Sequence, residues 1–87
     1  MERRFDLWNR AVKQTRLPLI EMIGNRRVLI ENHLGILIYS EHEIVVRVRT
    51  GCVCIAGAFL KLSMMSKEQL VITGCIREIK LEEECLE

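Results

Sequence analysis

Apolar and polar residues follow two different periods along this chain. Within the first 16 residues the apolar side chains recur at helical spacing, and from Leu19 onward they come in short runs or alternate with polar ones. A period near 3.6 is typical of an amphipathic helix, and a period of two is typical of a half-buried strand. The pattern therefore predicts one N-terminal helix followed by a β-rich domain.

The N-terminal segment, residues 1–17, is predicted to be an amphipathic basic helix. Phe5, Trp8 and Val12 fall on one stripe, and the basic residues lie mostly elsewhere around the helix. Pro18 disfavours a helical conformation at the residue before it, so the helix is expected to end there. The stripe could dock on the domain's own sheet, on a partner or on a membrane surface. The candidates for membrane or partner docking are Arg4, Trp8, Arg10 and Val12.

The remainder of the chain is dense in Ile, Val and Leu, and its alternation is clearest in "EIVVRVR". Ile44, Val46 and Val48 are expected to face one way and Val45 and Arg47 the other. Short strands at intervals of 7–11 residues, joined by short loops, indicate an antiparallel meander.

Turn signals divide this region into expected strands. The pair Gly24-Asn25 favours a tight turn, and Thr50-Gly51 favours another. The stretches "VLIEN" and "GILIYS" are expected to face each other as a hairpin. Further strands are expected at "CVCI", "AFLKLSM", "QLVIT" and "CIREIKL".

Two internal echoes favour either a sheet that curls over itself or a short solenoid, and they do not choose between the two. "IYSEHEIVV" (38–46) aligns with "MMSKEQLVI" (64–72) at an offset of 26, and the pattern I-x-G ends at both Gly57 and Gly74. Glycine at these positions is expected to mark a bulge or bend. The predicted fold class is mainly β: one small domain, an antiparallel meander curling into a roll, sandwich or short solenoid, preceded by the N-terminal helix.

Composition agrees with one small folded domain. The chain has 87 residues, of which 49% are hydrophobic and 29% charged. A domain of this size buries only about 60–65% of its unfolded surface, so an oligomer or partner would add stability. We divide it into the helix at 1–17, a β-rich domain at 18–82 and an acidic tail at 83–87.

Charge and hydropathy bear on location and partners. No apolar run approaches the roughly 20 residues of a membrane span, and the charged N-terminus does not resemble a signal peptide, so a cytoplasmic location is expected. The net charge is +1, but residues 1–16 hold five bases against two acids, and residues 82–87 hold four acids. These two ends could pair between copies of the chain, or the basic one could face anionic lipid.

The four cysteines are expected to be reduced thiols that pack as small apolar residues. Cys52 and Cys54 are spaced C-x-C, which places both sulfurs on one face of a strand, and Cys75 and Cys85 stand alone. Zinc sites prefer C-x₂-C pairs on tight turns. We therefore expect no metal and no cofactor.

The stretch "RVLIENHLGILIYS" offers the main candidate for chemistry. Glu31, Asn32 and His33 are adjacent, and acid–base catalysis would need such groups to converge on one pocket, here with Tyr39 or Arg47. They can equally form a polar turn closed by Gly35, with Asn32 in a left-handed conformation. We favour this structural turn, with a role in interaction, because an 87-residue sheet protein offers little depth for a pocket. The alternative is a small ligand-binding or enzymatic domain centred on the three residues.

Other chemical motifs are missing from the sequence. It contains no phosphate-binding glycine loop, no nucleophile elbow and no pair of metal-binding histidines. A sheet that binds nucleic acid would need exposed aromatics, and the strands supply only Tyr39 and Phe59. We expect neither an enzyme nor a nucleic-acid partner.

The segment from Leu19 to Leu81 resembles the YabP/YqfC family of sporulation proteins. The most specific part is the core I-E-N-H-x-G-I-x-x-Y-S/T, followed here by Glu43-Ile44. The layout is closest to the YqfC branch, in which a basic segment with a Trp precedes Leu-Pro. The matching core positions are Ile30, Glu31, Asn32, His33, Gly35, Ile36, Tyr39 and Ser40.

This resemblance implies a cellular role but no specific chemical reaction. The family is associated with the mother-cell compartment during spore formation and has no known enzymatic activity. The expectation is a non-catalytic assembly or adaptor module, homo-oligomeric and working with a membrane-bound sporulation partner, in the cytoplasm or at a membrane. The four cysteines and Met64-Met65 depart from the family pattern.

Overall fold

The computed structural model describes residues 15–85, which form one antiparallel sheet. This confirms a single small domain that is mainly β. The predicted helix lies outside the described residues except for its last three positions, so it stays a prediction. The strands are β1 (Leu19–Ile23), β2 (Arg27–Glu31), β3 (His33–Tyr39), β4 (Glu43–Val48), β5 (Gly51–Met65) and β6 (Gln69–Glu82), in the order β1-β2-β6-β5-β4-β3.

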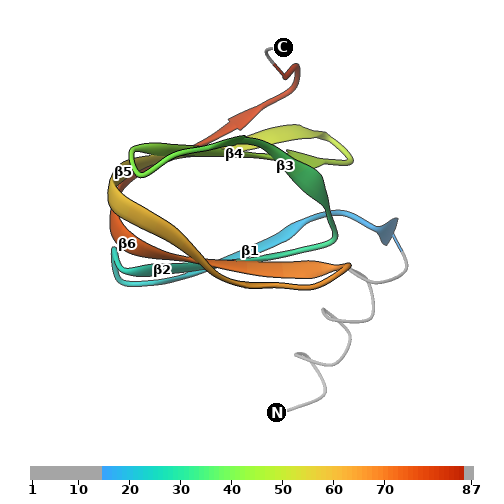
Figure 1. The fold of residues 1–87 in the computed structure, drawn as a ribbon. Helices are drawn as coiled ribbons and strands as arrows, with labels where there is room; N and C mark the ends of the chain where they lie inside the picture. The colour runs from blue at the N-terminus through green and yellow to red at the C-terminus, as the bar shows by residue number, and fades with distance from the viewer. Residues whose placement is uncertain (1–14, 86–87) are drawn as a thin grey trace.

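The long strands β5 and β6 fold this one sheet into two layers (Figure 1). β4 pairs with residues 51–56 of β5, whereas β2 pairs with residues 69–73 of β6. The upper layer in Figure 1 therefore holds β3, β4, the first half of β5 and the second half of β6. The lower layer holds β1, β2, the first half of β6 and the second half of β5. The structure is thus a rolled two-layer sheet and not a solenoid.

Glycines let the two long strands bend where they pass between the layers. The β5–β6 register shifts between Ala56 and Gly57 and again after Ala58. A Cβ on Gly57 would lie 2.0 Å from the Cys75 carbonyl oxygen, and Gly74 has a φ of +138°. The prediction of bends at these glycines is confirmed. The prediction of separate strands on either side of them is wrong, because bulges bend β5 and β6 without interrupting their pairing.

The core lies between the two layers. In β4, Ile44, Val46 and Val48 join it, whereas Val45 is buried on the outer face, so the predicted alternation is confirmed. Burying one such side chain stabilises the fold by about 1.5–3 kcal/mol. The core cluster consists of Val28, Ile30, Ile44, Val46, Val48, Val53, Ile55, Leu60, Leu70, Ile72 and Ile76.

The expected hairpin between "VLIEN" and "GILIYS" is wrong. β2 pairs with β1 and β6, and β3 lies at the far end of the strand order. Only Asn32 separates the two strands, and its φ of +64° turns the chain from the lower layer into the upper one. The expected meander holds from β3 to β6, but the sheet is completed by the non-sequential pairing of β2 with β6.

The predicted turns hold. The Gly24-Asn25 pair forms the β1–β2 turn, in which the Arg26 N–H donates to the Ile23 carbonyl. The similarity between residues 38–46 and 64–72 corresponds in the structure to the same type of turn formed twice. Ser40 and Ser66 each accept on Oγ the N–H of the residue three positions on, at 3.0 and 3.1 Å, and each donates its own N–H to that residue's carbonyl.

Candidate functional site

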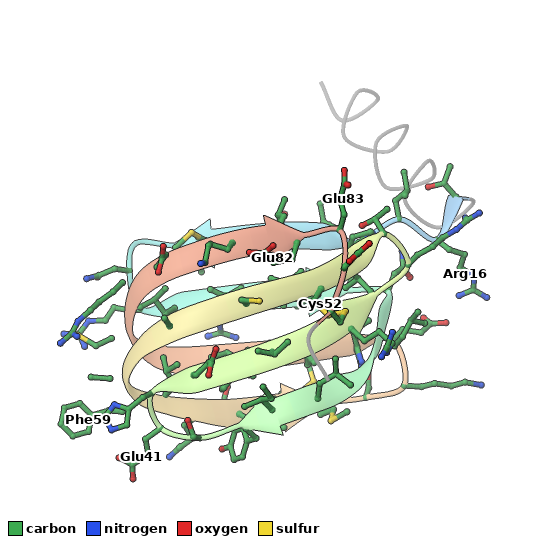
Figure 2. The ribbon with its side chains drawn as sticks, turned by 90° about the horizontal axis from the view of Figure 1, so that it is seen from above. Arg16, Glu41, Cys52, Phe59, Glu82 and Glu83 are labelled. Atoms are coloured by element: carbon green, nitrogen blue, oxygen red, sulfur yellow. A yellow bond between two sulfur atoms is a disulfide. The ribbon has the colours of Figure 1, made fainter. Side chains whose placement is uncertain are left out.

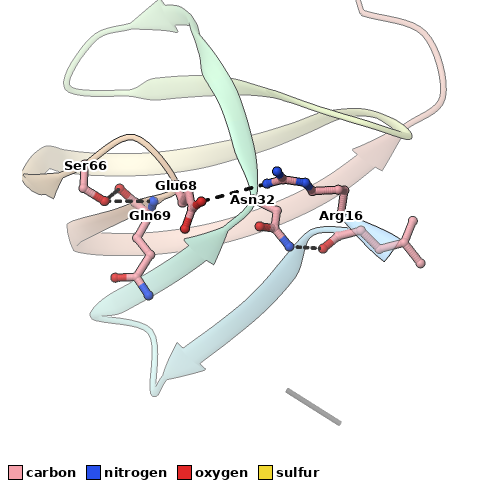
Figure 3. Close-up of polar contacts among 6 residues, drawn as sticks. Arg16, Asn32, Ser66, Glu68 and Gln69 are labelled. Atoms are coloured by element: carbon pink, nitrogen blue, oxygen red, sulfur yellow. Dashed lines mark hydrogen bonds and ion pairs between the residues drawn. The ribbon is translucent and has the colours of Figure 1, made fainter. Parts of the chain in front are cut away.

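The segment with the family-like core forms the junction between the two layers. The Asn32 N–H donates to the Glu68 carbonyl at 2.6 Å, and its Nδ2 donates to the Leu17 carbonyl at 2.8 Å (Figure 3). Asn tolerates the left-handed backbone better than other side chains. Asn32 therefore holds together the chain before β1, the β2–β3 link and the turn between β5 and β6.

His33 is buried, with 6% of its surface exposed, and both ring nitrogens have partners. Nδ1 accepts the Gly35 N–H at 3.0 Å, so this nitrogen carries no proton, and Nε2–H donates to the Ser66 carbonyl at 2.9 Å. Gly35 lies at a φ of +122° in the part of β3 where the pairing with β4 is irregular. One ring nitrogen thus bonds to the backbone of β3, and the other bonds to the turn after β5.

Tyr39 makes the corresponding contact at the other end of β3. Its Oη accepts the backbone N–H of Leu62, in the second half of β5, at 3.1 Å. β3 is the edge of the upper layer, and the second half of β5 is the edge of the lower layer. His33 and Tyr39 therefore connect the two edges at both ends, along a line that we call the seam.

The structure brings Asn32 and His33 to one hollow, but Glu31 and Tyr39 do not line it. Glu31 pairs with Gln69 across the β2–β6 ladder, and its Oε2 accepts the Gln69 Nε2–H at 2.5 Å. His33 points to the interior, and Tyr39 lies six residues further along β3, about 20 Å away. The convergence that a catalytic cluster would need is not formed by these residues.

One open hollow of about 400 Å³ lies beside Asn32 and His33. Arg16, Arg49 and Lys67 line it together with Glu68, so cations predominate. Two of these cations have partners on the chain itself: the Arg16 guanidinium lies 3.9 Å from the Glu68 carboxylate, and Arg49 donates to the Thr15 carbonyl. Among residues 15–85, no group of three His, Cys, Asp or Glu side chains is placed to hold a metal ion.

The cysteines differ from the expectation of four reduced thiols. Cys52 and Cys85 form a disulfide between residues 33 positions apart, with Cα atoms 5.4 Å apart. The β5–β6 register places Cys52 opposite Glu82. After Glu82 the chain bends so that Cys85 reaches Cys52. Sequence spacing could not show this meeting, because it depends on how the two long strands pair.

A second hollow of about 240 Å³ lies next to this disulfide, on the outer face of the upper layer. The free Cys54 also lines it, so both sulfurs of the C-x-C pair lie on one face, as predicted. Burial raises the pKa of the Cys54 thiol, the carboxylates of Glu82 and Glu43 raise it further, and Lys80 opposes them.

The sequence pattern did not indicate that exposed apolar side chains would lie along the seam. Apolar side chains that are 40–62% exposed lie along it, on both strands between the two polar links. A signal was present in the adjacent apolar pair Met64-Met65, but the order of residues along the chain does not show that β3 lies near them. The exposed seam residues are Leu34, Leu37, Tyr39, Met64 and Met65.

The candidates for N-terminal docking cannot be placed. Arg4, Trp8, Arg10 and Val12 lie outside the described residues, so their role stays a prediction. Within residues 15–85 there is no helix of the length and apolarity that a bilayer crossing requires.

Comparison with known proteins agrees with the resemblance found in the sequence. The model of the YabP family matches residues 15–85. The uncharacterized protein YqfC of Bacillus subtilis (strain 168) is 31% identical over 67 residues, which cover 77% of this chain and 72% of that protein. No solved structure matches. A family match over most of the chain, together with this relative, shows that the chain belongs to the YabP family.

Proposed function

We propose that this protein is a non-catalytic sporulation protein that acts in the mother cell as a small assembly or adaptor module, together with a membrane-bound partner. Membership of the YabP family supports the link to sporulation. The use of the motif side chains supports a structural role for the motif. Asn32, His33 and Tyr39 all bond to backbone groups of this chain, so the motif stabilises the roll.

The observation that carries the proposal is the exposed apolar seam. Leu34 of β3 is 62% exposed and Met65 of β5 is 48% exposed, and each is the chain neighbour of a residue that the His33–Ser66 hydrogen bond joins. Exposed apolar side chains that gather in one region of a small domain are typical of a protein interaction site. Methionine suits such a site because its flexible thioether adapts to the partner's shape. The polar links keep the two edges in a defined position, so the seam is a preformed surface.

Spore yield tests this proposal. Deleting the gene from its own host should lower the number of heat-resistant spores at an unchanged vegetative growth rate, and the wild-type gene should restore it. A Leu34→Lys/Met65→Lys variant should restore fewer spores although the protein accumulates normally. Leu81→Lys is the matched control, because Leu81 is 69% exposed on β6, away from the seam. Full spore yield after deletion, or from the seam variant, would contradict the proposal.

The alternative of a small ligand-binding domain applies to the hollow beside Asn32. It would use the cations there to hold an anion, and it makes a separate prediction. Phosphate or a dicarboxylate should raise the melting temperature of the wild-type protein, and Lys67→Gln should abolish that rise. An unchanged melting temperature with such anions counts against this alternative.

A further inference from the structure

We propose that copies of this chain join head to tail, with the Phe59 side chain of one copy seated in the hollow beside the Cys52–Cys85 disulfide of the next. This rests on the proposed assembly function and assigns self-association to two surfaces other than the seam. One surface presents an exposed ring with an excess of cations near it, and the other is concave and lined mostly by acids.

Phe59 is placed in a way that the fold itself does not require. Its side chain is 77% exposed at the bend of β5, and its backbone has a φ of +56°. An exposed position with this backbone normally holds Gly, Asn or Asp, and a bulky residue there is a conformational outlier. Such outliers are concentrated at functional positions. Aromatic side chains, Phe among them, are also enriched at protein–protein interfaces.

Three cations lie on the backbone segments next to Phe59. Gly74 donates its N–H to the Arg26 carbonyl and has the Phe59 carbonyl on its other side, so Arg26, in the β1–β2 turn, and Phe59, in β5, flank it. With strands about 4.8 Å apart, the two lie about 10 Å from each other. Arg27 and Lys61 form the next row, on either side of Thr73. We call Phe59 with Arg26, Arg27 and Lys61 the knob.

The hollow beside the disulfide has the size and lining for one large apolar side chain. Its volume of about 240 Å³ is below the 300–1,000 Å³ of typical small-molecule sites. Val45 and Cys52 lie at its base, 5% and 2% exposed, and Ile38 and Cys54 also line it. An aromatic ring in such a site would be shielded from water on most of its surface.

The charges around the two surfaces are complementary. Glu43, Glu82 and Glu84 line the hollow against one cation, Lys80. The knob has three cations, and its neighbouring acid is Glu41, whose carbonyl accepts the Leu60 N–H. Opposite excess charge of this kind steers association and sets orientation. It favours a second copy of this chain over an anionic membrane as the occupant, because a membrane would use only the knob.

The two surfaces lie too far apart for one copy to fill its own hollow. Cys54 and Phe59 are five residues apart on β5, about 16 Å along the strand. Figure 2 shows Phe59 and Glu41 at one end of the roll and Cys52 with Glu82 towards the other. Because different patches meet, the contact is heterologous, and repeating it extends the assembly beyond a dimer.

Light scattering on the full, oxidised chain over a concentration series tests this. The wild-type mass should rise with concentration past that of a dimer, and it should fall when salt screens the charges. Phe59→Asn keeps a residue that accepts the left-handed backbone and removes the ring. It should weaken association by about 30-fold or more, as expected for a central aromatic anchor.

Complementary variants make the test specific. Phe59→Asn keeps an intact hollow, and Cys54→Phe keeps an intact knob but fills the hollow. Each should be monomeric alone, and a mixture should give a dimer with one chain of each. Glu82→Lys/Glu84→Lys is a second hollow variant that changes only exposed side chains, and it should behave like Cys54→Phe. Lys67→Glu, in the turn between β5 and β6 and outside both surfaces, should assemble like the wild type.

The outcomes separate the two proposals. Assembly that persists in Phe59→Asn, or a folded mixture that stays monomeric, overturns the head-to-tail contact and leaves the adaptor proposal to the spore-yield test. A wild-type chain that is monomeric at every soluble concentration overturns the head-to-tail contact as well. Binding of anionic vesicles that depends on Phe59, without self-association, would assign the knob to a membrane surface and overturn the inference.

Discussion

The Nε2 atom of His33 lies 2.9 Å from the carbonyl oxygen of Ser66, and this contact ties the first residue of β3 to the turn after β5. The two residues belong to different layers, and they are 33 positions apart in the chain. The same imidazole accepts the Gly35 N–H through Nδ1. One buried side chain thus organises both the local backbone of β3 and the closure of the roll.

Replacing His33 should be costly. His33→Ala removes a buried ring and leaves the Ser66 carbonyl and the Gly35 N–H without their partner, so we expect a loss of about 2–4 kcal/mol in the free energy of unfolding. Urea denaturation followed by circular dichroism measures this. His42→Ala is the control, because His42 is exposed in the β3–β4 turn, and its change should stay within about 0.5 kcal/mol. Equal stabilities of the two variants would show that the His33 contacts do not hold the layers together.

Two substitutions at Asn32 separate the contributions of its backbone conformation and of its side chain to the free energy of unfolding. Asn32→Gly keeps a residue that accepts the φ of +64° and loses the bond to the Leu17 carbonyl, so we expect about 1 kcal/mol of destabilisation. Asn32→Ala loses the same bond and adds strain, for about 2–3 kcal/mol in total. Thermal unfolding of both variants gives the comparison. A more stable Ala variant would mean that this residue does not need the left-handed backbone.

Gly57 should not tolerate even a methyl group. The added Cβ of Gly57→Ala would lie 2.0 Å from the Cys75 carbonyl oxygen, which belongs to the backbone of β6 and cannot move aside. We expect about 3 kcal/mol or more of destabilisation, or no folded protein. At Gly24 nothing lies within 4 Å, and only the φ of +55° opposes a side chain, so Gly24→Ala should cost about 1–2 kcal/mol. Melting temperatures rank the two, and the reverse order would argue against the close packing at the bend.

The thiol of Cys54 should react slowly near neutral pH. Burial, Glu82 and Glu43 raise its pKa, so less thiolate is present at pH 8 than in an exposed cysteine, and alkylation by iodoacetamide should accelerate only at higher pH. Glu82→Gln removes a raising charge and should speed the reaction. Lys80→Gln removes a lowering charge and should slow it. Peptide mass spectrometry separates Cys54 from Cys75, the other free thiol. If both variants change the rate in the same direction, the electrostatic explanation fails.

Much of the local structure followed from residue types alone. Alternation assigned Ile44, Val46 and Val48 to the core, because side chains on a strand point to opposite faces in turn. Gly24-Asn25 marked a turn, and Gly57 and Gly74 marked the bends, because these positions need a positive φ or the absence of a Cβ. Ser40 and Ser66 occupy corresponding positions in the sequence echo, but that they close the same turn was shown only by the structure.

Only the tertiary structure decided which distant segments meet. Strand periodicity does not encode partners, so the pairing of β2 with β6 and the seam between β3 and β5 could not be deduced from it. The Cys52–Cys85 disulfide, the hollow beside it and the exposure of Phe59 all depend on the register and bending of β5 and β6. By itself, then, the sequence determined the β-rich character of the chain, the inward face of β4, the bends at Gly57 and Gly74 and the glycine turns, because these follow from neighbouring residues. The surfaces that can bind a partner were decided by long-range pairing.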